Sequence, residues 1–280
     1  MPVERYAPRT ISDLRELLKG ENIYVLGGGT DLSIQIRAGK KSPRGLICLG
    51  GLAEAQGIRR ADSAIEIGAS VTMSELALSA ELSGAYAALS QAAAGVGSEQ
   101  IRNAATIGGN IANAAPGADT LPALLLLDAE VQVAGPEGIE WRKLQSILPG
   151  AARLCSNEVL LSIRLPLRDN AWTSAFHKLG SRRTMTISKL SIALGLQLEN
   201  GVIHNARAYA GAVGLCPLEV ESVGALLKGR VIKDNDTARI LGEALEAFVR
   251  RTIPNRPSCT YKAWAAKAVA ADVMANFACV

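Results

Sequence analysis

Apolar positions in the first fifty residues follow two different spacings. Leu14, Leu17 and Leu18 recur at the three- and four-residue intervals of a helix. Two short apolar runs, at residues 23–26 and 46–49, have the length of buried strands. Because strand and helix patterns alternate here, we predict that the chain opens with a small α/β unit.

Both patterns continue as far as residue 166. Ile65 and Ile67 alternate with polar or small neighbours, which is typical of a half-buried strand. Thr72 and Glu75 have the spacing of a helix capping box. The further elements predicted here are a strand over 65–72, a helix starting at 72–75, helices over 86–94 and 121–127, and strands over 130–133 and 158–165.

A polar break at residues 166–170 separates this region from a second pattern. Three strand-like segments follow at 171–179, 190–199 and 201–211, and Asn200-Gly201 is a hairpin signal between the last two. Helical spacing then predicts helices near 218–227, 236–250 and 261–277. We therefore predict an α+β fold with two domains. They are residues 1–166, made of lobes of about 1–57 and 58–166, and residues 171–280, a three-stranded antiparallel sheet with helices.

Two glycine-rich stretches fit neither pattern. Gly27, Gly28 and Gly29 follow the apolar run at 23–26 and precede Thr30 and Asp31. Residues 105–120 contain three glycines, a proline and five side chains with polar tips, and we predict a loop there rather than a helix or strand. Bare backbone in both stretches suits close approach to a ligand, and exposed N–H groups suit an anion such as diphosphate. A structural turn with side-chain caps is the alternative.

Composition and charge exclude several functions. Aromatic residues make up 4% of the 280 residues and the net charge is only +4, which argues against a nucleic-acid partner. The longest apolar run, 121–127, is too short for a membrane span, and the first residues do not form a signal peptide. The five cysteines are scattered without C-x-x-C spacing, so we expect reduced thiols, no metal site and a cytoplasmic protein.

Four blocks of sequence, in the same order, resemble the flavin subunit of the molybdenum hydroxylases, a family that includes xanthine dehydrogenase, aldehyde oxidase and carbon monoxide dehydrogenase. The blocks are VLGGGTDL at 25–32, GSEQIRNAATIGGNIANAAPGAD at 97–119, LLSIRLP at 160–166 and FHKLGSRR at 176–183. The resemblance runs over nearly the whole chain. It implies a two-lobed FAD-binding domain of the PCMH type, made of a small α/β unit and a mixed-sheet unit, and a C-terminal domain like that of the carbon monoxide dehydrogenase flavoprotein.

The resemblance also assigns cofactor-binding residues. The first stretch would hold the diphosphate and ribityl parts of FAD, the second would hold FAD from the other side, Leu160 would pack near the flavin ring, and Lys178 would lie close enough to stabilise the anionic reduced flavin. Asn113 and Asp119 would bind near the diphosphate and adenosine. The predicted FAD contacts are Val25, Leu26, Gly27, Gly28, Gly29, Thr30, Asp31, Leu32, Thr106, Ile107, Gly108, Gly109, Asn110, Asn113, Asp119, Leu160 and Lys178. For Asn113 and Asp119, capping of the next helix is the alternative.

No catalytic motif stands out in the sequence, as expected for a protein whose cofactor performs the chemistry. The family resemblance implies an electron relay in a heterotrimer, in which a [2Fe–2S] small subunit passes electrons from a molybdopterin large subunit to FAD in this chain, and FAD passes them to NAD+ or another acceptor. Purine hydroxylation is the expected reaction, with nicotinate, aldehyde or carbon monoxide as alternatives. Many relatives have an aspartate shortly after the Arg182-Arg183 pair, where this chain has residues 184–187 without one, and this leaves the acceptor open.

Two other classes of function are alternatives. One is a flavin-less scaffold that only joins the other subunits. The other is a stand-alone FAD oxidoreductase related to the cell-wall reductase that acts on UDP-sugars, against which the missing catalytic acid and the relay-type C-terminal domain argue.

Overall fold

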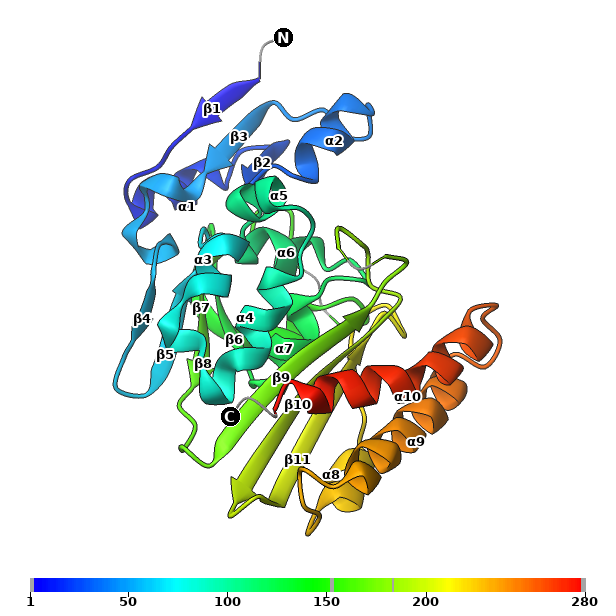
Figure 1. Ribbon diagram of the computed structural model, residues 1–280. Coiled ribbons are helices and arrows are strands. Elements are labelled where there is room, and N and C mark those ends of the chain that lie inside the picture. The colour runs from blue at the N-terminus through cyan, green and yellow to red at the C-terminus, as the bar shows by residue number, and fades with distance from the viewer. Residues whose placement is uncertain (1–2, 152–153, 183, 278–280) are drawn as a thin grey trace. The chain divides into compact units, whose positions relative to one another are not determined.

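The computed structural model describes residues 3–151, 154–182 and 184–277 (Figure 1). The chain divides into two compact units, each built from separate segments. The first unit contains residues 1–75, 99–113 and 128–166, and the second contains residues 76–98, 114–127 and 167–280. The chain therefore passes between the units several times before residue 167, whereas the sequence pattern predicted one boundary near there.

The first unit contains two sheets. One is parallel, with the strand order β1-β3-β2, and the buried Leu14 of α1 and Leu18, directly after this helix, pack in one core with Ile47 of this sheet. The other has the order β4-β5-β8-β6-β7, and every neighbouring pair in it is antiparallel, whereas a mixed sheet was expected. Within it, β6 and β7 are joined by a two-residue turn, which only antiparallel strands allow. The elements are β1 (Glu4–Tyr6), α1 (Ile11–Leu17), β2 (Ile23–Leu26), α2 (Leu32–Arg37), β3 (Gly45–Cys48), β4 (Ile58–Arg60), β5 (Ala64–Gly68), α5 (Glu99–Ala104), α6 (Ile107–Asn113), β6 (Glu130–Gly135), β7 (Gly138–Lys143) and β8 (Val159–Pro166), with short 3₁₀ turns at Leu49–Gly51, Ala53–Ala55 and Leu144–Ile147.

Two predictions in this unit are wrong. The strand predicted over 65–72 ends at Gly68, because the chain turns there and the Val71 N–H donates to the Gly68 carbonyl oxygen over 3.0 Å. The predicted loop after Thr106 is instead the helix α6, with Gly108 and Gly109 inside it and no left-handed φ at either. An added Cβ on Gly108 would lie 2.7 Å from the Cβ of Ala69, so this glycine serves close packing of α6.

The capping box at Thr72 is confirmed. The Thr72 N–H donates to the Glu75 carboxylate over 2.7 Å, and the Glu75 N–H donates to the Thr72 hydroxyl over 3.2 Å. These two bonds satisfy N–H groups at the start of α3 (Met73–Leu78), within which the chain passes to the second unit.

The second unit is a sheet with helices on both faces (Figure 1). Its strand order is β12-β11-β10-β9, and the hairpin predicted at Asn200-Gly201 is confirmed by φ values of 52° and 79° at these residues. Alternate residues of β10 point to opposite faces: Leu194 belongs to the core shared with α9 and α10, whereas an added Cβ on Gly195 would meet Leu126 of α7. The elements are α4 (Ala87–Ala94), α7 (Thr120–Leu126), β9 (Trp172–Leu179), β10 (Leu190–Glu199), β11 (Val202–Gly211), β12 (Leu218–Glu219), α8 (Ser222–Leu227), α9 (Asn235–Thr252) and α10 (Cys259–Ala275), with 3₁₀ turns at Ala80–Leu82 and Gly84–Tyr86.

The three strands and the last two helices predicted after residue 170 are present, and β12 adds a short edge strand where a helix was predicted to begin. Arg183 and Cys279, which the sequence interpretation used, lie outside the described residues.

Candidate FAD-binding site

A cleft of about 430 Å³ in the first unit is lined by both glycine-rich stretches. One wall comes from the end of β2 and the turn into α2, and the other comes from the start of α6. The lining residues are Tyr24, Val25, Gly27, Gly28, Gly29, Thr30, Asp31, Leu32, Gln35, Lys41, Ala105, Thr106, Gly109, Asn110, Ala112 and Asn113. The predicted convergence of two distant stretches on one cleft is therefore present in the structure.

The three successive glycines have different structural roles. An added Cβ on Gly28 would overlap the carbonyl oxygen of Ala104, and one on Gly27 would come within 2.6 Å of the Thr106 hydroxyl oxygen. These two glycines therefore let the two stretches touch each other. Gly29 has a φ of 69°, a left-handed conformation that only glycine adopts without strain, and it turns the chain into α2.

Hydrogen-bond donors of the backbone border this cleft. Among the described residues, no acceptor takes the N–H groups of Gly28, Gly29 or Thr30, whereas the Gly109 N–H donates to the Thr106 hydroxyl over 3.2 Å. That hydroxyl is also the one atom within 4 Å of an added Cβ on Gly109. The cleft thus presents unused amide donors and a surface without side chains, an arrangement suited to an anionic group lying close to the backbone.

The cleft is also lined by polar side chains that the sequence interpretation missed. The Asp31 carboxylate accepts a hydrogen bond from the Gln35 amide, one turn further along. The Lys41 ammonium lies 4.5 Å from the centroid of the Tyr24 ring, within the range of a cation–π contact. Tyr24, Gln35 and Lys41 belong to no motif, and only the folding of the chain around α2 brings them to the cleft.

A smaller apolar cavity of about 80 Å³ adjoins the cleft, with which it shares Val25, Gly27, Thr106, Gly109 and Ala112. Its other lining residues are Leu49, Ala69, Ser70, Gly108, Leu154, Glu158, Val159 and Leu160. Leu160, on β8, is 3% exposed and so belongs to the core as well as to the cavity wall. Leu26 and Ile107, which were predicted to contact FAD, line neither the cleft nor the apolar cavity.

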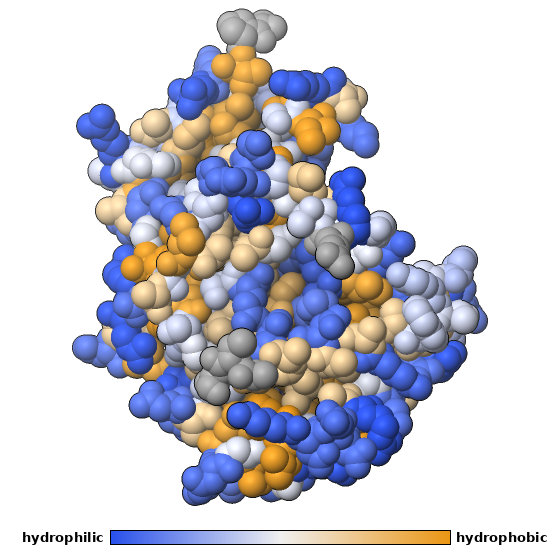
Figure 2. Space-filling model, in the orientation of Figure 1, coloured by the Kyte–Doolittle hydropathy of each residue, from blue (hydrophilic) through white to orange (hydrophobic). Residues whose placement is uncertain are grey.

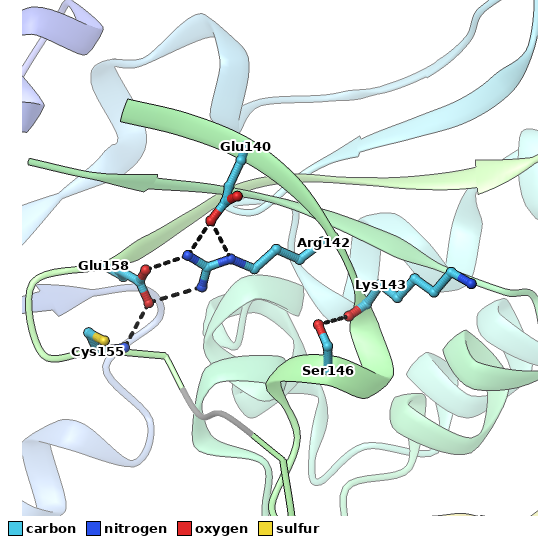
Figure 3. Close-up of polar contacts among 6 residues, drawn as sticks. All are labelled: Glu140, Arg142, Lys143, Ser146, Cys155 and Glu158. Carbon is cyan, nitrogen blue, oxygen red and sulfur yellow. Dashed lines mark hydrogen bonds and ion pairs between the residues drawn. The ribbon is translucent and has the colours of Figure 1, made fainter. Parts of the chain in front are cut away.

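Glu158 is the ionisable residue on the wall of the apolar cavity, and its side chain is only 13% exposed. Figure 3 shows that the Arg142 guanidinium binds both of its oxygens, over 2.6 and 3.2 Å, and also contacts Glu140. The N–H of Cys155 donates to the same carboxylate over 2.8 Å. The Arg142 hydrogen bonds lower the pKa of Glu158, so this residue is ionised at neutral pH.

Asp119 and Lys178 form an ion pair in the core of the second unit. The Lys178 ammonium lies 2.5 Å from the Asp119 carboxylate and donates to the carbonyl oxygens of Gly95, over 2.7 Å, and Thr186, over 3.1 Å. The Ser188 hydroxyl donates to the other carboxylate oxygen. Burial raises the pKa of Asp119, and the nearby Lys178 charge opposes this rise. Each of these two predicted cofactor contacts therefore already has a partner within the chain.

The family described as "FAD binding domain in molybdopterin dehydrogenase" matches residues 1–168. The chain belongs to this family. The nicotinate dehydrogenase FAD-subunit of Eubacterium barkeri is 30% identical to it over 92% of this chain and 90% of that protein. The xanthine dehydrogenase FAD-binding subunit of Escherichia coli O157:H7 is 30% identical over 76% of this chain and 74% of that protein.

Solved structures agree with this membership. A chain of the reconstituted CO dehydrogenase from Oligotropha carboxidovorans superposes with a TM-score of 0.85 at 26% identity, covering 98% of this chain and 97% of that chain. The protein is thus an FAD-binding subunit of the molybdenum hydroxylase type, with FAD as its cofactor.

The cleft fits such a cofactor. The FAD-binding domain offers unused amide donors for a diphosphate and, next to them, apolar walls for a flat ring. Within the described residues, no cluster of His, Cys, Asp and Glu could hold a metal ion, and Cys48, Cys155, Cys216 and Cys259 are free thiols. No helix in the described part of the chain is long and apolar enough to cross a membrane. On the face of the molecule drawn in Figure 2, hydrophilic residues lie between smaller hydrophobic patches.

Proposed function

We propose that the cleft between the 27–31 turn and α6 holds FAD, and that the chain is the electron-transferring subunit of a cytoplasmic molybdenum hydroxylase. Bound FAD supplies the redox chemistry, because it can take up two electrons from one partner and release them to another. The observation that carries this proposal is the meeting of two glycine-rich stretches, distant in sequence, at one cleft in a domain of this family.

The chain's own residues would bind and orient the cofactor rather than react. The N–H groups of Gly28, Gly29 and Thr30 would donate to the diphosphate, and α6 would close the opposite side through Gly109 and Asn110. The remaining predicted contacts would complete the lining of the cleft; they are Val25, Gly27, Asp31, Leu32, Thr106 and Asn113. Leu160 and its apolar neighbours would keep water from the ring system.

A [2Fe–2S] small subunit and a molybdopterin large subunit would complete the relay, and NAD+ is the proposed acceptor. We propose a purine as the substrate of the large subunit, as in the xanthine dehydrogenase of the E. coli relative. Nicotinate is the second candidate, because the E. barkeri relative matches over a larger share of the chain. Reduction of NAD+ by the purified complex with xanthine or with nicotinate would decide between them.

The visible spectrum of the purified chain tests the proposal directly. We expect flavin absorption bands with close to one FAD per chain, either as isolated or after addition of FAD. A colourless protein that takes up no added FAD would refute the proposal and favour a flavin-less scaffold.

Two substitutions at one position test the location of the site. Gly109 lies within α6, borders both spaces and has one side-chain atom within 4 Å of an added Cβ. Gly109→Ala adds one carbon at the cleft wall and should lower FAD occupancy only slightly. Gly109→Leu should fill the cleft and lower FAD occupancy by at least tenfold at unchanged secondary structure, measured by circular dichroism. Equal FAD occupancy in the two variants would place the cofactor elsewhere.

A further inference from the structure

Lys41 is the cation on the wall of the cleft, and it lies outside every motif of the chain. It follows α2 in sequence, and its ammonium lies 4.5 Å from the centroid of the Tyr24 ring. Tyr24 is on β2, the strand that leads into the glycine turn, and Tyr24 and Lys41 both line the cleft. The ring therefore holds the end of a flexible side chain at the cleft wall.

The hydrogen-bonding capacity of this ammonium is unused. No carboxylate or hydrogen-bond acceptor among the described residues binds Lys41, whereas the carboxylate on the same cleft, Asp31, is engaged by Gln35. Lys41 is only partly exposed, and a charge that is partly withdrawn from solvent favours an anionic partner. Among the described residues, the same cleft thus contains one unpaired positive charge and the unused amide donors of Gly28, Gly29 and Thr30.

The geometry points to Lys41, held by Tyr24, as the residue that selects a phosphorylated ligand: its ammonium binds the diphosphate of FAD. This inference rests on the proposed function and adds a specificity to it. Amide donors supply only partial charges, whereas a diphosphate carries two full negative charges, so a charge-assisted bond contributes more than another amide would. The same contact would form with ADP, which has the diphosphate without the flavin, and would be lost with riboflavin, which has no phosphate.

The decisive experiment compares Lys41→Gln with Lys40→Gln in the full-length chain after removal of flavin. Both substitutions remove one positive charge, but Lys40 is exposed and does not line the cleft. We expect Lys41→Gln to weaken FAD and ADP binding by about tenfold to a hundredfold and to leave riboflavin binding unchanged. Lys40→Gln should change all three affinities by less than about twofold.

Two further variants separate a charge effect from a structural one. Lys41→Arg should keep FAD affinity within about threefold, because it keeps the charge and the aromatic contact. Tyr24→Leu should weaken FAD binding less than Lys41→Gln does, since the ammonium remains but is less well held.

The possible results have distinct meanings. FAD binding by Lys41→Gln that equals that of the unsubstituted chain would overturn this inference alone, and so would an equal loss for FAD and riboflavin. Failure of the unsubstituted chain to bind FAD would instead overturn the proposed function.

Discussion

The ion pair of Asp119 and Lys178 gives the sharpest test of the energetics of the second unit. The Asp119 side chain is 6% exposed and that of Lys178 is 13% exposed, so each charge is stabilised by the other and by a few hydrogen bonds rather than by water. Lys178→Met removes the ammonium at similar volume and leaves Asp119 with the Ser188 hydroxyl as its remaining partner. Asp119→Asn removes the carboxylate charge and leaves the ammonium with the carbonyl oxygens of Gly95 and Thr186.

Removing one member of a buried pair costs about 3–5 kcal/mol, a large part of the total stability of an ordinary domain. We expect Lys178→Met to reach this range, because Asp119 is the more deeply buried partner. Asp119→Asn should cost less, about 2 kcal/mol, because two carbonyl oxygens still bind the ammonium. The double variant should be more stable than the sum of the two single effects predicts, since it leaves no unpaired charge.

The pH dependence of Lys178→Met provides an independent check. Burial raises the pKa of Asp119, and loss of the Lys178 charge raises it further. A carboxyl with a raised pKa in the folded state stabilises the fold when it is protonated, and this contribution is lost as the pH rises through that pKa. The variant should therefore be less destabilised at pH 5 than at pH 8.

Urea unfolding followed by tryptophan fluorescence can measure these effects in the second unit alone. Two of the three tryptophans, Trp172 and Trp264, belong to this unit, and Trp141→Phe removes the one in the first unit. Single variants within about 1 kcal/mol of the unsubstituted protein would refute this prediction. So would a Lys178→Met variant whose loss of stability, relative to the unsubstituted protein, is larger at pH 5 than at pH 8.

Two further predictions concern the first unit. Gly28→Ala should destabilise it by at least about 2 kcal/mol, because the added Cβ overlaps the Ala104 backbone. The control Gly50→Ala should be nearly neutral, because its added Cβ meets nothing within 4 Å. Equal midpoints of thermal unfolding for the two variants would contradict this prediction. Glu158→Gln should lower the free energy of unfolding by about 1–3 kcal/mol at pH 7. This difference should shrink as the pH falls from 5 to 3. The pKa of Glu158 is lowered in the folded state, so its carboxylate stabilises the fold only while it is ionised. The control Glu140→Gln, at a side chain 61% exposed, should have little effect, and an acid-insensitive Glu158→Gln difference would argue against the Arg142 contact.

Local sequence patterns predicted the elements whose conformation depends mainly on their own residues. The strands β9, β10 and β11 are long and largely buried segments, and Asn200-Gly201 has the backbone preference that the hairpin requires. Elements with few apolar residues were not predicted. The strand β1 and the strand β7 are half-exposed edges, held in their sheets by backbone pairing with β3 and β6, which no local pattern reveals.

Local sequence patterns also did not predict which segments belong to which unit. Segments 76–98 and 114–127 lie early in the sequence but pack in the second unit, where α4 and α7 lie against the sheet. The hydrogen bond from the Ala88 N–H to Ser174, over 3.0 Å, joins positions 86 residues apart. Such contacts depend on side chains that come together only in the folded sheet. The polar break at 166–170 therefore marks only one of the several points at which the chain passes from one unit to the other.

The glycines of the two stretches show how two distant segments can be predicted to meet although the local structure predicted for one of them is wrong. Gly108 and Gly109 were predicted to lie in a loop against a ligand, yet both lie in a helix. Gly108 packs on Ala69, Gly28 packs on Ala104, and only Gly29 needs a left-handed backbone. Glycine at such positions brings two backbones together, and the cleft is the space beside that contact. The pattern therefore located the cleft, whereas its charged wall at Lys41 depends on the course of the chain after α2 and required the structure.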